Sequence, residues 1–70
     1  MNRIYERLAD KSAFVIFDND SFQTYVVQTT FILERLYSNK PAVSEEKFES
    51  LSLNEQIDLF IASGIDKELN

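Results

Sequence analysis

The expected fold depends on the stretch Ser21–Ser38, SFQTYVVQTTFILERLYS, whose pattern fits both a helix and a strand. At about 100° per residue, most of its large apolar side chains fall within an arc of roughly 140°, which is typical of an amphipathic helix. Its β-branched residues favour a strand instead. However, apolar residues follow one another in Tyr25-Val26-Val27 and in Phe31-Ile32-Leu33, so the alternation of a half-buried strand is missing. We therefore predict a helix over residues 21–38.

The residues before this stretch allow the same two interpretations. Apolar residues continue one helical stripe over residues 2–17, which predicts a first helix there. The run Ala13-Phe14-Val15-Ile16-Phe17 also has the composition of a short buried strand, and the turn-forming Asp18-Asn19-Asp20 follows it. We prefer two long helices that pair as an antiparallel hairpin. The alternative is an α+β fold with a short β-hairpin at about residues 13–28.

The C-terminal third contains clear helix boundaries. Ser44 is placed to cap a short helix, and Ser52 with Glu55 forms the S-x-x-E capping box of a last helix over about residues 53–63. Gly64 follows that helix, where a residue with positive φ commonly ends it. The buried stripe of the last helix is expected to consist of Leu53, Ile57, Phe60 and Ile61.

These elements predict a mainly α protein, a small helical bundle built on the antiparallel helical hairpin plus two short C-terminal helices. A chain of 70 residues has the length of one small domain, so we expect a single domain over residues 1–70. Its C-terminal tail, residues 66–70, is expected to fray.

The composition excludes several kinds of site. The sequence has no Cys and no His, which excludes Ser-His and Cys-His nucleophile pairs, structural zinc sites and thiol redox centres. Its single Gly cannot supply a glycine-rich phosphate loop. The longest apolar run is residues 13–17, far shorter than the about 20 residues that span a bilayer. We therefore expect a cytoplasmic, non-enzymatic protein with no cofactor, no metal and no membrane contact.

The negative charge is concentrated toward the C-terminus. Residues 1–40 contain five acidic and five basic residues, whereas residues 41–70 contain seven acidic residues and two lysines. This excess of −5 predicts either a solubility coat or a docking face for a basic partner protein. The expected partner-binding acidic residues are Glu45, Glu46, Glu49, Glu55 and Asp58.

Several apolar residues lie off the predicted buried stripes. Large side chains on a second helix face indicate a helix that is buried on two sides or one that meets another chain. Because a chain of 70 residues has little material to cover a central helix twice, we predict a homodimer. The expected apolar interface residues, toward a second copy or another partner, are Phe14, Phe17, Val27, Phe31 and Leu59.

These features predict a small acidic protein that binds another protein and regulates or inhibits it stoichiometrically. One alternative is an inhibitor that mimics a nucleic acid and blocks a DNA- or RNA-binding protein. The other is a nucleic-acid-binding module that uses Arg3, Arg7 and Lys11, which recur at i, i+4 and i+8 and would share one helix face. Glu6 and Asp10 lie beside them, which favours a solvated face of mixed charge, so nucleic acid is not the expected partner.

Overall fold

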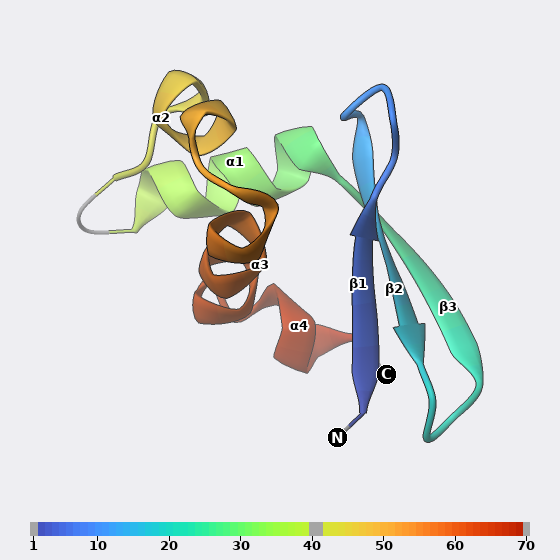
Figure 1. Ribbon diagram of the computed structural model, residues 1–70. Coiled ribbons are helices and arrows are strands. Elements are labelled where there is room, and N and C mark those ends of the chain that lie inside the picture. The colour runs from blue at the N-terminus through green and yellow to red at the C-terminus, as the bar shows by residue number, and fades with distance from the viewer. Residues whose placement is uncertain (1, 40–41, 70) are drawn as a thin grey trace. The chain divides into compact units, whose positions relative to one another are not determined.

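The computed structural model describes residues 2–39 and 42–69 and shows an α+β protein (Figure 1). The chain forms two compact units, Met1–Thr30 and Phe31–Asn70. The first unit contains a three-stranded sheet, and the second contains most of the helical residues. The predicted all-α helical bundle is therefore wrong, because three strands lie between Arg3 and Gln28, within the segment assigned to the antiparallel helical hairpin.

The sheet is an antiparallel meander of β1 (Arg3–Arg7), β2 (Ala13–Asp18) and β3 (Gln23–Gln28), with β2 in the centre. Its register pairs Tyr5 with Ile16 and Ile16 with Tyr25. The β2–β3 hairpin spans residues 13–28, which is where the alternative α+β prediction placed a hairpin. Pairing of β1 with β2 adds a third strand that neither prediction contained.

The turn between β1 and β2 forms without glycine. Lys11 has a positive φ of 65°, and its amide donates to the carbonyl of Leu8 at 2.9 Å. Asp10 Oδ1 accepts hydrogen bonds from the Ser12 amide at 2.9 Å and the Ser12 hydroxyl at 2.7 Å. Arg7 Nη2 donates to the Lys11 carbonyl at 3.0 Å. The side-chain hydrogen bonds of Asp10 and Arg7 thus stabilise a chain reversal in which glycine usually occupies the residue with positive φ.

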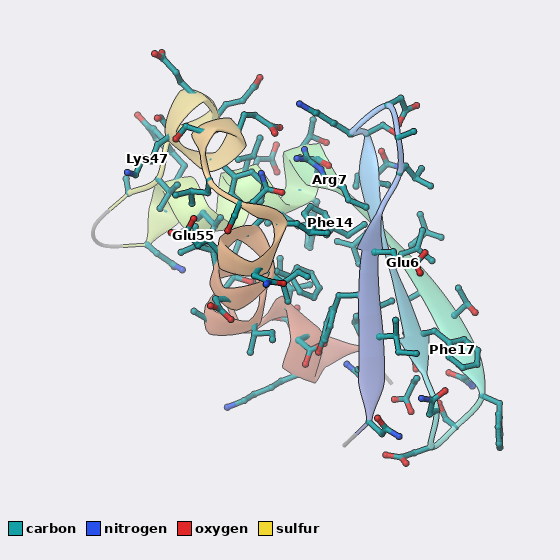
Figure 2. The ribbon with its side chains drawn as sticks, in the orientation of Figure 1. Glu6, Arg7, Phe14, Phe17, Lys47 and Glu55 are labelled. Atoms are coloured by element: carbon teal, nitrogen blue, oxygen red, sulfur yellow. The ribbon has the colours of Figure 1, made fainter. Side chains whose placement is uncertain are left out.

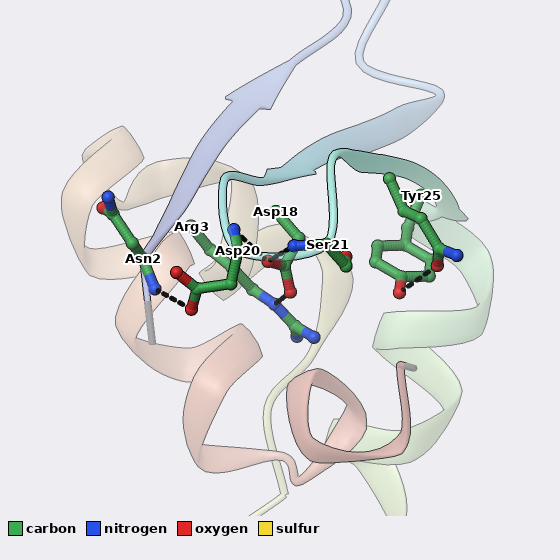
Figure 3. Close-up of polar contacts among 7 residues, drawn as sticks. Asn2, Arg3, Asp18, Asp20, Ser21 and Tyr25 are labelled. Atoms are coloured by element: carbon green, nitrogen blue, oxygen red, sulfur yellow. Dashed lines mark hydrogen bonds and ion pairs between the residues drawn. The ribbon is translucent and has the colours of Figure 1, made fainter.

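Asp18 organises the turn between β2 and β3 (Figure 3). Its Oδ1 accepts from the amides of Asp20 at 2.8 Å and Ser21 at 3.1 Å, and its Oδ2 accepts from Arg3 Nε at 2.9 Å. The bond from Arg3 and then the amide of Ser21 lower the pKa of Asp18 below its ordinary value near 3.8. Phe22 follows with φ of 57°, and this residue is 80% exposed.

The helices predicted over residues 2–17 and over the first half of residues 21–38 are wrong for a physical reason. A central strand with apolar residues on both faces shows a continuous apolar run and no alternation, and β2 is such a strand. In β3, Val26 is 62% exposed whereas its neighbour Val27 is buried. The apolar pair therefore marks both faces of a strand, and periodicity alone does not distinguish this from a helix.

In the described part of the chain, four helices follow the sheet: α1 (Thr29–Ser38), α2 (Glu45–Ser50), α3 (Leu53–Ala62) and α4 (Ile65–Glu68). Helix α1 begins directly after β3, so the second half of the predicted helix over residues 21–38 is present and ends where expected. The two short C-terminal helices are also confirmed as α2 and α3.

The predicted helix caps are confirmed. The Ser44 side chain accepts from the Lys47 amide at 3.1 Å at the start of α2. Ser52 and Glu55 form a complete capping box at the start of α3. Gly64, directly after the C-cap of α3, has φ of 87°. These motifs depend on residues within one helical turn, so the local sequence determines them.

The buried face of α3 differs in part from the predicted stripe. Phe60 is buried as expected, but Leu53 and Ile61 are 45% and 40% exposed. Gln56, one turn before Phe60, is buried instead. The other buried apolar residues of Phe31–Asn70 are Ile32, Leu36, Phe48 and Ile65.

Helix α4 lies in the segment that was expected to fray. Arg35 on α1 forms two bonds with the Glu68 carboxylate, from Nη1 at 2.7 Å and from Nη2 at 3.2 Å. Arg35 Nη1 also lies 3.4 Å from the carbonyl of Ser63. The bond from Arg35 lowers the pKa of Glu68. These contacts connect α1 with the C-terminal helical turn, and the last expected tail residue, Asn70, lies outside the described residues.

Candidate partner-binding groove

A groove of about 430 Å³ lies between α2 and α3. Its lining combines apolar side chains with three charged ones. The lining residues are Val43, Lys47, Leu51, Glu55, Asp58, Leu59 and Ala62. Figure 2 labels Lys47 on α2 and Glu55 on α3, which border the groove from opposite helices.

The two walls of the groove follow from helical spacing. On α3, the lining residues Glu55, Leu59 and Ala62 are separated by four and three positions, so they share one face. Lys47 on α2 and Leu51 at its C-cap are also four positions apart. Because Phe48 and Phe60 occupy the buried faces of the same helices, the groove lies along the faces that remain accessible.

Gln56 connects the two walls. It is 4% exposed, and its Nε2 donates to the carbonyl of Phe48 at 2.9 Å and to that of Leu51 at 3.4 Å. Both carbonyls belong to the C-terminal end of α2, where the helix supplies no further i+4 amides for its last carbonyls. The Gln56 amide therefore caps α2 and fixes its end against α3.

The acidic rim of the groove includes Glu55, whose carboxylate is held by its own helix cap. Glu55 Oε1 accepts from the Ser52 amide and the Ser52 hydroxyl, both at 3.0 Å. The bond from the Ser52 amide is the largest cause that lowers the pKa of Glu55, and the positive charge of Lys47 adds a smaller effect. The Glu55 carboxylate therefore stays charged to a lower pH than an ordinary glutamate does.

The structure brings three of the predicted interface residues together in this groove. Glu55 and Asp58 come from the predicted acidic face, and Leu59 comes from the predicted apolar set. Glu46 borders a separate depression of about 300 Å³ with Ser44, Lys47 and Ser50. The two remaining acidic candidates, Glu45 and Glu49, lie on α2 outside both linings.

The other predicted apolar interface residues lie elsewhere. Phe14 on β2 and Val27 on β3 are directly paired and buried, so neither offers a surface for a partner. Phe17 lies on the opposite face of β2, as Figure 2 shows for Phe14 and Phe17. Phe31 on α1 is 47% exposed, and the Arg35 guanidinium lies 5.7 Å from its ring centroid.

The predicted basic stripe of Arg3, Arg7 and Lys11 does not exist as a helix face. Arg3 and Arg7 lie on β1, and Lys11 lies in the following turn. Arg3 is paired with Asp18, and the Arg7 guanidinium lies 5.1 Å from the ring centroid of Phe14. The two arginines are thus engaged within the sheet unit, which removes the geometry on which the nucleic-acid-binding module was based.

Four residues that line the groove, and Gln56, which holds its two walls together, were not predicted from the sequence. Val43 and Leu51 lie outside the helices, so helical periodicity does not identify them. Ala62 lies at the end of α3, but its side chain is too small to stand out as an interface residue. Lys47 was not singled out because its neighbours in the sequence are acidic. Gln56 had one detectable sign, a polar residue one turn before Phe60 on the buried face of the helix.

Within residues 2–39 and 42–69, no three potential metal-ligating side chains gather in one place. In the same ranges, none of the helices has the length and apolar character needed to cross a bilayer. No protein-family model, no curated protein and no solved structure matches the chain.

Proposed function

We propose that this chain is a non-enzymatic binding protein that takes an apolar, positively charged segment of a partner protein into the groove between α2 and α3. The observation that supports this most strongly is the meeting of Leu59 with Glu55 and Asp58 in one concavity. Burying an apolar side chain of the ligand against the apolar walls is favourable, and the carboxylates at the rim attract basic side chains beside it.

The shape of the groove favours a helical segment. Two helices form its walls, and a volume of about 430 Å³ accommodates a few large side chains. An amphipathic helix can place an apolar anchor and a basic residue one turn apart, which matches the four-residue spacing of Leu59 and Glu55 on α3. The proposed ligand is therefore an amphipathic helix with aliphatic or aromatic anchors and a Lys or Arg flank.

The wider charge distribution supports the same partner. Residues 41–70 carry an excess of −5, and Glu45, Glu46 and Asp58 are exposed on α2 and α3. Such a field accelerates the encounter with a basic partner and weakens as salt screens it. A binder of this kind acts stoichiometrically, by occupying a segment that its partner needs for another contact.

Binding of synthetic peptides tests the proposal. Two peptides of about 15 residues, the length at which an isolated helix becomes stable, carry the same Leu and Phe anchors but either lysines or glutamates on the flank. Fluorescence anisotropy is expected to show binding of the lysine peptide at low ionic strength, and weaker binding as salt is added. Equal binding of the glutamate peptide would contradict the proposed charge recognition.

Three variants locate the binding site. Leu59→Ser removes an apolar wall and is expected to weaken binding about tenfold, because burying a leucine contributes on the order of 1.4 kcal/mol or more. Asp58→Lys reverses a rim charge and is expected to weaken binding by about two- to tenfold. Glu34→Lys, which makes the same charge change on an exposed residue of α1 outside the groove, serves as the matched control. If Leu59→Ser binds like the parent while remaining folded, the groove is not the site.

A further inference from the structure

The charged side chains that line the groove differ in how far the protein itself already engages them. Glu55 Oε1 accepts from the amide and the hydroxyl of Ser52, both at 3.0 Å, so this carboxylate holds the start of α3. The positive charge of Lys47, which lines the groove from α2, also acts on Glu55 (Figure 2). A ligand cation that approached Glu55 would therefore be repelled by Lys47 and would compete with the helix cap.

Asp58 is the second carboxylate of the groove, and its surroundings are different. It lies three positions after Glu55 on α3, which corresponds to about 4.5 Å along the helix axis. The residue is exposed, and within residues 2–39 and 42–69 its side chain has no hydrogen bond or ion pair. Its neighbour in the chain is Leu59, which lines the same groove. The groove thus contains one carboxylate that the helix cap uses and one that is available to a ligand.

We propose that Asp58 is the specificity-determining residue of the groove, which pairs with the basic side chain of the ligand, whereas Glu55 serves the helix cap and does not contact the ligand. This assignment rests on the proposed function, because it concerns the same groove and the same apolar, basic helix. A Lys or Arg that contacts Asp58 lies beside the apolar anchor that packs on Leu59. An ion pair at the edge of an apolar contact is partly shielded from water, which strengthens it relative to a fully exposed pair.

The assignment narrows the class of ligand. One available carboxylate requires one basic residue, placed about one helical turn from the anchor, where Cβ atoms of a helix lie about 5–6 Å apart. A second basic residue that faced Glu55 would lie near Lys47 and gain little. We therefore expect a single Lys or Arg beside the anchor to supply most of the charge recognition.

A contact of this kind differs measurably from long-range attraction by the acidic residues. The excess of −5 in residues 41–70 acts over a distance, and removing either Glu55 or Asp58 changes it by the same unit of charge. Long-range attraction mainly raises the association rate, whereas a short-range pair mainly slows dissociation. If only the field mattered, the two carboxylates would be interchangeable. If Asp58 forms the pair, they are not.

Two matched variants test the assignment. Asp58→Asn and Glu55→Gln each remove one negative charge and keep nearly the same shape, and a glutamine at this position of α3 preserves the capping box. The probe is a peptide of about 15 residues with Leu and Phe anchors and one lysine four positions from the Leu anchor. Stopped-flow fluorescence measures its binding at about 0.15 M salt, where charges more than about 8 Å apart are largely screened. Asp58→Asn is expected to weaken binding about three- to tenfold through faster dissociation, and Glu55→Gln to leave it within about 1.5-fold.

A second peptide, with glutamine in place of the lysine, completes a double-mutant cycle. Replacement of the lysine and Asp58→Asn remove the same pair, so together they should weaken binding no more than either change alone. Replacement of the lysine and Glu55→Gln should act independently. Circular dichroism verifies that each variant is folded, and the Asp58 cycle does not depend on the Glu55 variant.

The possible failures are distinguishable. Equal weakening by Asp58→Asn and Glu55→Gln would overturn the assignment in favour of the long-range field, while the groove remained the binding site. Additive effects of Asp58→Asn and the lysine replacement would also overturn it. A parent chain that binds neither peptide would refute the proposed function, and the assignment to Asp58 with it.

Discussion

Substitution of Gln56 by Leu tests how the groove is held together. Leucine has nearly the volume of glutamine, so the change removes the amide while leaving no large cavity. The loss includes one well-formed hydrogen bond to the Phe48 carbonyl at 2.9 Å and one marginal bond to the Leu51 carbonyl at 3.4 Å. The Phe48 carbonyl retains a second donor, the Leu51 amide at 3.2 Å.

The expected decrease in the free energy of unfolding follows from these contacts. A hydrogen bond contributes about 0.5–1.5 kcal/mol net, and a buried carbonyl left without any partner costs about 1–3 kcal/mol. Because Phe48 keeps one partner, we expect Gln56→Leu to lower the free energy of unfolding by about 1–2 kcal/mol. For a chain of this length, that corresponds to a fall of roughly 5–15 °C in Tm.

Thermal and urea unfolding followed by circular dichroism measure this effect, with the peptide assay on the same variant as a second readout. Peptide binding should weaken together with stability, because the amide sets the end of α2 against α3. The matched control is Ile61→Leu, a conservative change on the exposed side of the same helix. A Gln56→Leu variant as stable as the parent would refute the role of the amide as a structural connection.

Two further predictions concern the backbone and the acid limit of stability. Gly64 has φ of 87° and no atom within 4 Å of an added Cβ, so Gly64→Ala should cost about 1 kcal/mol through backbone strain alone, measured by urea unfolding. An unchanged urea midpoint would contradict the left-handed conformation at this residue. The pKa of Asp18 is lowered in the folded state, so its carboxylate stabilises the fold above pH about 4, and that contribution is lost as the pH falls through the folded pKa. Asp18→Asn should flatten the acid limb of a plot of the urea midpoint against pH, and an equally steep limb would show that Asp18 does not contribute to it.

The start of α2 and both ends of α3 could be predicted because their determinants are local, whereas the start of α1 at Thr29 was not predicted. Ser44, Ser52 with Glu55, and Gly64 each act within one turn of the chain, and the structure confirms all of them. These motifs satisfy or reorient specific backbone groups regardless of what the helix packs against.

The sheet could not be predicted with the same rules, because its pattern depends on both of its faces. Val26 and Phe17 are apolar on the sheet face opposite Phe14, so neither β2 nor β3 alternates in sequence. Lys11 adopts positive φ where a glycine would have marked the turn. The helical pattern in the sequence therefore came from apolar residues on a sheet face that is partly exposed to solvent.

Three residues of the candidate site could be predicted individually from the sequence, but the groove that they line could not. The concentration of negative charge predicted Glu55 and Asp58 as part of an acidic surface. Leu59 was predicted as an interface residue because it lies outside the expected buried stripe of its helix. Their meeting in one groove depends on the angle between α2 and α3, which the buried amide of Gln56 helps to fix. No local sequence rule specifies such a contact, since Gln56 and Phe48 are eight positions apart.

The central claim, that the groove between α2 and α3 binds an apolar basic helix, is tested most directly by nuclear magnetic resonance. Titration of the isotope-labelled chain with the lysine-flanked peptide should shift the amide signals of Val43, Leu51, Leu59 and Ala62 progressively. The signals of β1 and β3 should remain in place. Shifts confined to the sheet, or no shift at all with the lysine-flanked peptide in large excess, would contradict the claim.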